Sequence, residues 1–163
     1  MDRRRAINIL ADRSENRFSQ MRELSFFRGL GDDQLRLLTD LATPVEFPSG
    51  TLIFSECEPA TDFYVIISGC VFLEICGPQK CTTILTLGPG ELLGWSTLLG
   101  SSHLTATARC QEATRAFVLS GPEVNAKVDL NPRLGHELMR CVAYSISQRL
   151  TATRLQLLDL FQG

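Results

Sequence analysis

The segment that is best suited to bind a ligand is Gly94-Trp95-Ser96-Thr97, which follows a short apolar run. A glycine at the end of a strand allows close backbone approach, and a short helix beginning there directs free amide groups at one point. Those amides and the helix dipole favour a negatively charged ligand. Trp95 either stacks against a planar ligand or plugs the cavity itself. The sequence therefore predicts an anion-binding turn here.

The cysteines offer a second chemistry. Six are scattered along the chain without a C-x-x-C pair: Cys57, Cys70, Cys76, Cys81, Cys110 and Cys141. Zinc and iron–sulfur sites usually show tighter spacing, so no metal site is expected. Cys76 and Cys81 flank the turn of a predicted hairpin, where opposed residues lie within disulfide range. We expect two ordinary strand thiols there, with a cysteine-based redox sensor as the alternative.

No motif in the chain indicates catalysis. His103 and His136 are the only histidines, and neither lies in a G-x-S-x-G, H-E-x-x-H or Walker-type context. Ser96 does not lie on a nucleophile elbow. We therefore expect no catalytic residue and no enzyme activity.

Size and composition indicate one globular domain. The 163 residues are 44% hydrophobic and 21% charged, with a net charge of −2 that argues against a general nucleic-acid binder. An arginine-rich start, residues 3–17, is expected to be a solvated extension. No apolar run approaches the roughly 20 residues of a membrane span, and the N-terminus is too polar for a secretory signal. A cytoplasmic location, with no membrane partner, is the expectation.

The pattern of elements changes twice along the chain. Gly31 is expected to cap a helix with Leu35 and Leu38 on one face, closed by Pro44. Short apolar runs separated by Gly and Pro turns then predict six strands: residues 51–54, 63–67, 71–76, 82–87, 105–108 and 115–119. Such spacing is typical of an all-β sandwich or jelly-roll barrel. Helices return at Ser120, whose capping box includes Glu123, and at Asn131-Pro132.

The last helix is expected to run to about residue 161 and to carry two apolar stripes. A heptad seam extends back to Met139 and consists of Ala143, Ile146, Leu150, Thr153, Leu157 and Leu160. The other stripe, Leu134, Leu138 and Val142, is placed to pack on the barrel. A helix this long extends beyond a small barrel, so the seam predicts a homodimer rather than a helix lying only on its own domain.

This order of elements resembles the effector domain of the catabolite-activator-type bacterial regulators, within the cyclic nucleotide-binding domain superfamily. Four segments carry the resemblance: LSFFRGL at 24–30, FPSGTLIF at 47–54, FYVIISG at 63–69 and PGELLG at 89–94. The resemblance implies a jelly-roll barrel with flanking helices, mainly β, plus a long C-terminal dimerisation helix. The expected regions are an N-terminal extension (1–20), the barrel with its flanking helices (21–130) and the long helix (131–163).

The chain departs from the family at both charged positions of the phosphate-binding cassette. By resemblance, a glutamate that binds the ribose hydroxyl is replaced by Trp95, and the arginine that pairs with the cyclic phosphate is replaced by Leu104. Thr105 keeps the family's hydroxyl. His103 and Arg109 are two side chains that could compensate for the lost arginine by approaching an anion. We expect instead that His103 is a surface loop residue and Arg109 is an ion-pair partner.

The resemblance also places Thr153 and Arg154 at the positions that contact the nucleotide base. The family's helix-turn-helix domain has no counterpart before Gly163, so no DNA binding by this chain alone is expected. We expect a non-catalytic sensor domain that does not bind cyclic AMP or GMP tightly and acts through its dimer helix. The alternatives are a cyclic nucleotide receptor with a non-standard pocket, another small anion as ligand, or a purely structural dimer module.

Overall fold

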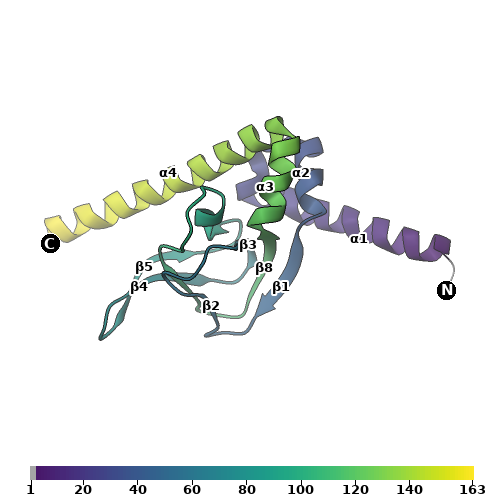
Figure 1. The fold of residues 1–163 in the computed structure, drawn as a ribbon. Helices are drawn as coiled ribbons and strands as arrows, with labels where there is room; N and C mark the ends of the chain where they lie inside the picture. The colour runs from purple at the N-terminus through teal and green to yellow at the C-terminus, as the bar shows by residue number, and fades with distance from the viewer. Residues whose placement is uncertain (1–2) are drawn as a thin grey trace.

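The computed structural model describes the backbone of residues 3–163 and the side chains from residue 13 onward. Helices lie at both ends and strands lie between them (Figure 1). The chain begins with α1 (Arg3–Glu23), the 3-10 helix η1 (Ser25–Gly29) and α2 (Asp32–Thr39). The strands are β1 (Thr43–Phe47), β2 (Leu52–Phe54), β3 (Asp62–Ser68), β4 (Val71–Cys76), β5 (Cys81–Leu87), β6 (Leu92–Leu93), β7 (Thr107–Cys110) and β8 (Thr114–Ser120). The short 3-10 helix η2 (Trp95–Thr97) follows β6, and α3 (Gly121–Leu130) and α4 (Pro132–Gln162) end the chain.

The strands form two antiparallel four-stranded sheets, ordered β1-β8-β3-β6 and β2-β7-β4-β5. The two sheets face each other without hydrogen bonding into one closed barrel, and the predicted jelly-roll class is confirmed. Side chains of β3 alternate between two environments, as the strand period requires. Phe63 and Val65 pack toward the helices, whereas Tyr64 and Ile66 pack into the space between the sheets.

Two strands were missed by the sequence patterns. β1 contains Pro44, which was expected only to close the preceding helix, and it pairs with β8 at the edge of its sheet. An edge position tolerates a proline because one side of the strand has no ladder partner. The other missed strand, β6, has only two residues. The run expected at 105–108 is displaced to Thr107–Cys110, because Thr105 and Ala106 still belong to the preceding loop.

The capping predictions had different outcomes at the two later helices. The Ser120 hydroxyl accepts a hydrogen bond from the Glu123 backbone N–H at 3.4 Å, which confirms the cap of α3. Asn131 does not cap α4 with its side chain. Its amide instead donates to the Lys127 carbonyl at 2.9 Å, so it closes α3 from the C-terminal side.

The arginine-rich start forms α1, whose last turns reach the core. Met21 is fully buried, and the Arg17 guanidinium donates to the Thr39 carbonyl at 3.2 Å. Arg36 of α2 pairs with Glu15 and lies over the ring of Phe18. The residues from 13 to 23 are therefore a packed helix rather than a solvated extension, while the side chains of Arg3, Arg4 and Arg5 lie outside the described residues.

Helix α4 packs with its first half against η1 and α3 and extends away from them with its second half (Figure 1). The stripe Leu134, Leu138 and Val142 is buried against the domain, as its spacing predicts. Beyond residue 150 every side chain of α4 is exposed. Among the described residues, none of the helices is long and apolar enough to cross a membrane.

Candidate functional site

The turn between β6 and η2 is shaped by Gly94. Its φ of +77° lies in the left-handed region, and a Cβ at this position would come within 2.9 Å of the Asp62 carbonyl oxygen. A side chain therefore has neither the conformation nor the space it needs. Ser96 and Thr97 follow in buried positions, and Trp95 is half-buried between them and α4. Gly94 is therefore required by the close packing of this turn against the backbone of Asp62.

Replacing Gly94 by alanine is expected to destabilise the domain by about 2–4 kcal/mol, from the left-handed backbone and the contact with Asp62 together. Gly50 is a matched control, because its φ of +81° is similar but nothing lies within 4 Å of the point that a Cβ would occupy. Urea unfolding of G94A and G50A should separate the two contributions. Equal loss of stability in both variants would show that the contact with Asp62 carries no cost.

A small cavity of about 100 Å³ opens beside this turn. The β2-β7-β4-β5 sheet lies on one side of it and α4 lies on the other. Its lining residues are Phe54, Leu73, Ile84, Leu85, Gly94, Trp95, Ser96, Leu104, Thr105, Ala106 and Arg149. Most of these side chains are apolar. The structure thus brings together Gly94, Trp95, Ser96, Leu104 and Thr105 of the predicted site.

Leu104, which the resemblance places at the arginine position, belongs to the core between the sheets. It is 7% exposed, and its backbone pairs with Glu58 and Cys57 at 2.9 Å on either side. Neighbouring His103 is exposed, and its Nδ1 lies 2.8 Å from the Ser102 hydroxyl. Arg109 faces away from the cavity and pairs with Glu74 at 3.4 Å. The two side chains therefore have the structural surroundings expected for a loop residue and an ion-pair partner.

Arg149 of α4 is the cation that sequence reasoning missed. Its side chain is buried at the edge of the cavity, where the guanidinium lies 4.6 Å from the centroid of the Trp95 ring and donates to the Leu92 carbonyl. Its buried Nε has no hydrogen-bond partner among the described residues. Burial lowers the pKa of Arg149 from its ordinary value to about 10, against an opposing effect of Glu91, so the side chain stays charged at neutral pH.

A signal for Arg149 was present in the spacing of α4. The stripe Leu134, Leu138 and Val142 continues seven residues later at position 149, so an arginine there must face the barrel. By contrast, Thr153 and Arg154, taken from the resemblance, are both exposed and lie beyond the cavity lining. The Thr153 hydroxyl donates to the Arg149 carbonyl at 2.9 Å within the helix.

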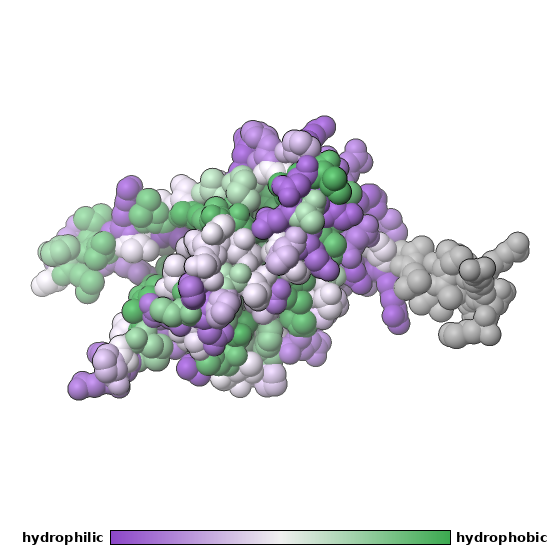
Figure 2. Space-filling view, viewed as in Figure 1, coloured by the Kyte–Doolittle hydropathy of each residue, from purple (hydrophilic) through white to green (hydrophobic). Residues whose placement is uncertain are grey.

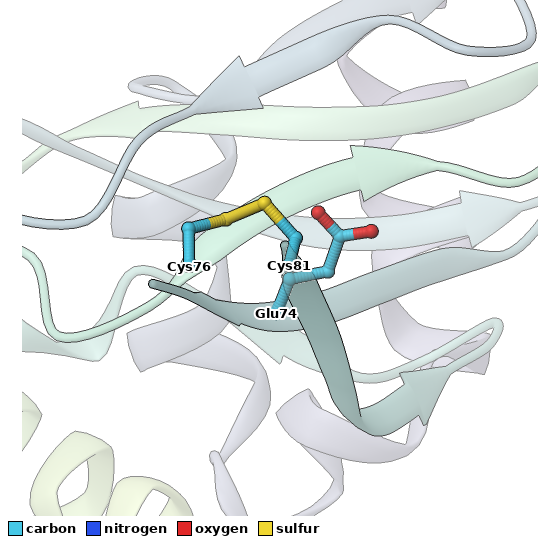
Figure 3. Close-up of side chains that lie close together, drawn as sticks. All are labelled: Glu74, Cys76 and Cys81. Carbon is cyan, nitrogen blue, oxygen red and sulfur yellow. A yellow bond between two sulfur atoms is a disulfide. The ribbon is translucent and has the colours of Figure 1, made fainter. Parts of the chain in front are cut away.

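The β4–β5 hairpin holds a separate cluster. Cys76 and Cys81 face each other in register and form a disulfide, with the Glu74 carboxylate on the same side of the hairpin (Figure 3). The expectation of two ordinary strand thiols is therefore wrong in this structure. The reason is geometric: the Gly77 N–H bonds to the Lys80 carbonyl at 2.9 Å, which closes a tight turn and places the two cysteines opposite one another.

Two facing antiparallel sheets, a glycine turn that opens a short helix, and a long helix packed against that turn define a regulatory domain of the cyclic nucleotide-binding type. Residues 44–131 match the family model described as "Cyclic nucleotide-binding domain". The chain belongs to the cyclic nucleotide-binding domain family.

Relatives within this family include transcriptional regulators. The "CRP-like cAMP-activated global transcriptional regulator" of Mycobacterium tuberculosis (strain CDC 1551 / Oshkosh) is 29% identical over 135 residues, which are 82% of this chain and 58% of that protein. This chain thus spans little more than half the length of that relative.

Solved structures show the same fold. A "Putative Cyclic nucleotide-binding protein" from Geobacter metallireducens GS-15 superposes with a TM-score of 0.73 at 29% identity, covering 81% of this chain and 96% of that one. The Thermus thermophilus Catabolite Activator Protein superposes with a TM-score of 0.65 at 28% identity, covering 84% and 62%.

Proposed function

We propose that this domain is a non-catalytic sensor that does not bind cyclic AMP or GMP tightly and that transmits the state of its cavity through α4. One observation carries the proposal: Arg149 extends from α4 to the cassette, where it contacts both Trp95 and the Leu92 carbonyl. Any change at the cassette therefore acts directly on the long helix. A ligand that contacts Arg149 differently in two states would shift the equilibrium between them.

Two features argue against a tightly bound cyclic nucleotide. The cavity of about 100 Å³ is smaller than the roughly 300–1,000 Å³ of typical small-molecule sites. The two charged groups that the family uses are also absent, since Trp95 and Leu104 stand in their places. A buried phosphate without its cation loses about 3–5 kcal/mol of binding free energy.

A small anion fits the chemistry better. The unpartnered Nε of Arg149 offers a buried donor, and the Thr105 side chain lines the same cavity. Charge-assisted hydrogen bonds to a guanidinium are among the stronger ones in proteins. We therefore place the ligand site at Gly94, Trp95, Ser96, Thr105 and Arg149.

Small anions are expected to raise the melting temperature of the wild-type domain by about 5 °C or more at saturation, because a ligand bound only to the folded state stabilises it. Calorimetric and thermal-shift titrations with phosphate, sulfate and nitrate measure this stabilisation. Cyclic AMP, cyclic GMP and cyclic dinucleotides are titrated in the same way for comparison. R149M should abolish the response, since methionine keeps the apolar packing and removes the donor.

R154M is the matched control, because Arg154 lies on the same helix in an exposed position. It should respond as the wild type does. Cyclic AMP binding at low micromolar concentration would overturn the proposal in favour of a conventional receptor. Unchanged melting curves across the whole panel would favour a purely structural dimer module.

We also propose that α4 pairs with α4 of a second copy. Hydrophobic side chains gather at its far end (Figure 2), and the seam residues Leu150, Leu157 and Leu160 are about half or more exposed. Ala143 is exposed as well, whereas Ile146 partly packs on the core. An exposed leucine seam of heptad spacing is stabilised when it packs against another helix. Because the relatives include transcriptional regulators, we place this sensor in the cytoplasm.

A further inference from the structure

The outer face of the β4–β5 hairpin brings three metal-ligating side chains together. Glu74 and Cys76 are two residues apart on β4 and so share one face of the strand, and Cys81 lies opposite Cys76 on β5. One carboxylate oxygen and the two sulfur atoms all lie within 4.8 Å of one another. Figure 3 shows the carboxylate beside the disulfide on one side of the hairpin.

We propose that, once the disulfide is reduced, Cys76, Cys81 and Glu74 bind one soft divalent cation of the zinc type. Thiolate and carboxylate are both zinc ligands, and three protein ligands with a fourth, open position is a known arrangement. Zinc–sulfur bonds of about 2.3 Å at tetrahedral angles set the two sulfurs about 3.8 Å apart. All three ligand atoms lie within 4.8 Å of one another, and the two sulfurs, now bonded as a disulfide, move apart to this separation once they are reduced.

Arg109 supports the site from the neighbouring strand. Its Nε lies 3.4 Å from Oε2 of Glu74, which leaves Oε1 for the metal. Ligating carboxylates are commonly held by a hydrogen bond of this kind. The two thiolates and the carboxylate carry three negative charges, which the divalent ion and Arg109 balance together. Glu74 is only 8% exposed, so an unbalanced negative charge there would cost more free energy than it would in open solvent.

The metal and the disulfide compete for the same two sulfurs. A small-molecule dithiol opens the disulfide when its thiolate attacks Sγ of Cys76 and Cys81 leaves as a thiolate. The second thiol of the reductant then displaces Cys76, and the reductant ends as a disulfide, having given up two electrons. A cavity of about 440 Å³, lined in part by Cys76 and Arg109, gives access to this sulfur. The metal then takes the place of the thiol protons.

The test is a titration of the metal-free chain with Co²⁺ after reduction of the disulfide. The reductant is a phosphine, because a thiol reductant would itself bind the metal through sulfur. We expect one equivalent of Co²⁺ to bind. It should give a sulfur-to-cobalt charge-transfer band whose intensity corresponds to two cobalt–thiolate bonds. C76S and C81S should each lose most of the band, and E74Q should lower the affinity by at least about tenfold. Zn²⁺ should displace the cobalt and bleach the band.

C70S is the matched control, because Cys70 immediately precedes β4, at the end away from Cys76, and is not among the three ligands. It should bind as the wild type does. Circular dichroism checks that the variants are folded, and E74Q tests the site without touching either sulfur. The proposal is overturned if reduced protein gives no band, if C76S and C81S keep it, or if the oxidised protein binds equally well.

Discussion

W95E/L104R is expected to bind cyclic AMP about two to three orders of magnitude more tightly than the wild-type chain. The double variant restores the two charges that the family's cassette uses. Leu104→Arg supplies a cation for the cyclic phosphate, worth about 3–5 kcal/mol in a buried pair. Trp95→Glu places a carboxylate where the Arg149 guanidinium now lies over the indole, so the new carboxylate also gains an ion-pair partner. Isothermal titration calorimetry measures the change in Kd.

The single variants serve as controls for this gain. L104R alone buries an arginine in a core that also contains Phe54 and Leu73, and it should lose stability without a ligand. W95E alone should pair with Arg149 and gain little affinity, because the phosphate still lacks its cation. If the double variant binds no better than the wild type, Leu104 does not stand at the arginine position and the placement of the cassette is wrong.

L150E/L157E is expected to convert a dimer of this domain into a monomer. Both side chains lie in the heptad seam of α4 and are 50% and 49% exposed in the single chain. In a paired helix they would be buried, and glutamates from two copies would then face each other across an apolar seam. Like charges in such positions cost several kcal/mol, so the dimer Kd should rise by at least about a hundredfold. Sedimentation equilibrium measures the oligomeric state.

L155E/L158E provides the matched control. These two leucines are 58% and 53% exposed on the same half of α4 but lie outside the seam. The control should remain dimeric with an unchanged Kd. A monomer from L155E/L158E and a dimer from L150E/L157E would show that the other face of the helix is the interface. A monomeric wild type at all concentrations would remove the dimer from the proposed function.

The sequence predicted local structure best where a single interaction between residues close in the chain determines it. Ser120 caps α3 because its hydroxyl needs only a neighbouring amide, and Gly94 adopts positive φ because its turn is tight. Leu35 and Leu38 face the core because the helix period places them there. The edge strand β1 was missed because Pro44 reads as a breaker, and only the sheet order shows that its missing amide costs nothing.

The site was harder to predict because it joins distant segments. Trp95 and Leu104 line one cavity, but the residue that completes it is 54 positions after Trp95 in α4. Spacing within α4 orients Arg149 toward the barrel without indicating which turn of the barrel it meets. Hairpin geometry allows the disulfide between Cys76 and Cys81, but the sequence alone favours two free thiols when a reducing compartment is assumed.

Arg149 and Leu150 are consecutive, so the guanidinium that touches the cassette and the first exposed leucine of the seam share one turn of backbone. If α4 pairs as proposed, anything that repositions Arg149 also alters association between protomers. Thermodynamic reciprocity then requires association to change ligand affinity by the same factor. The apparent binding constant would depend on protein concentration, and the two cavities of a dimer would fill interdependently rather than as separate receptors.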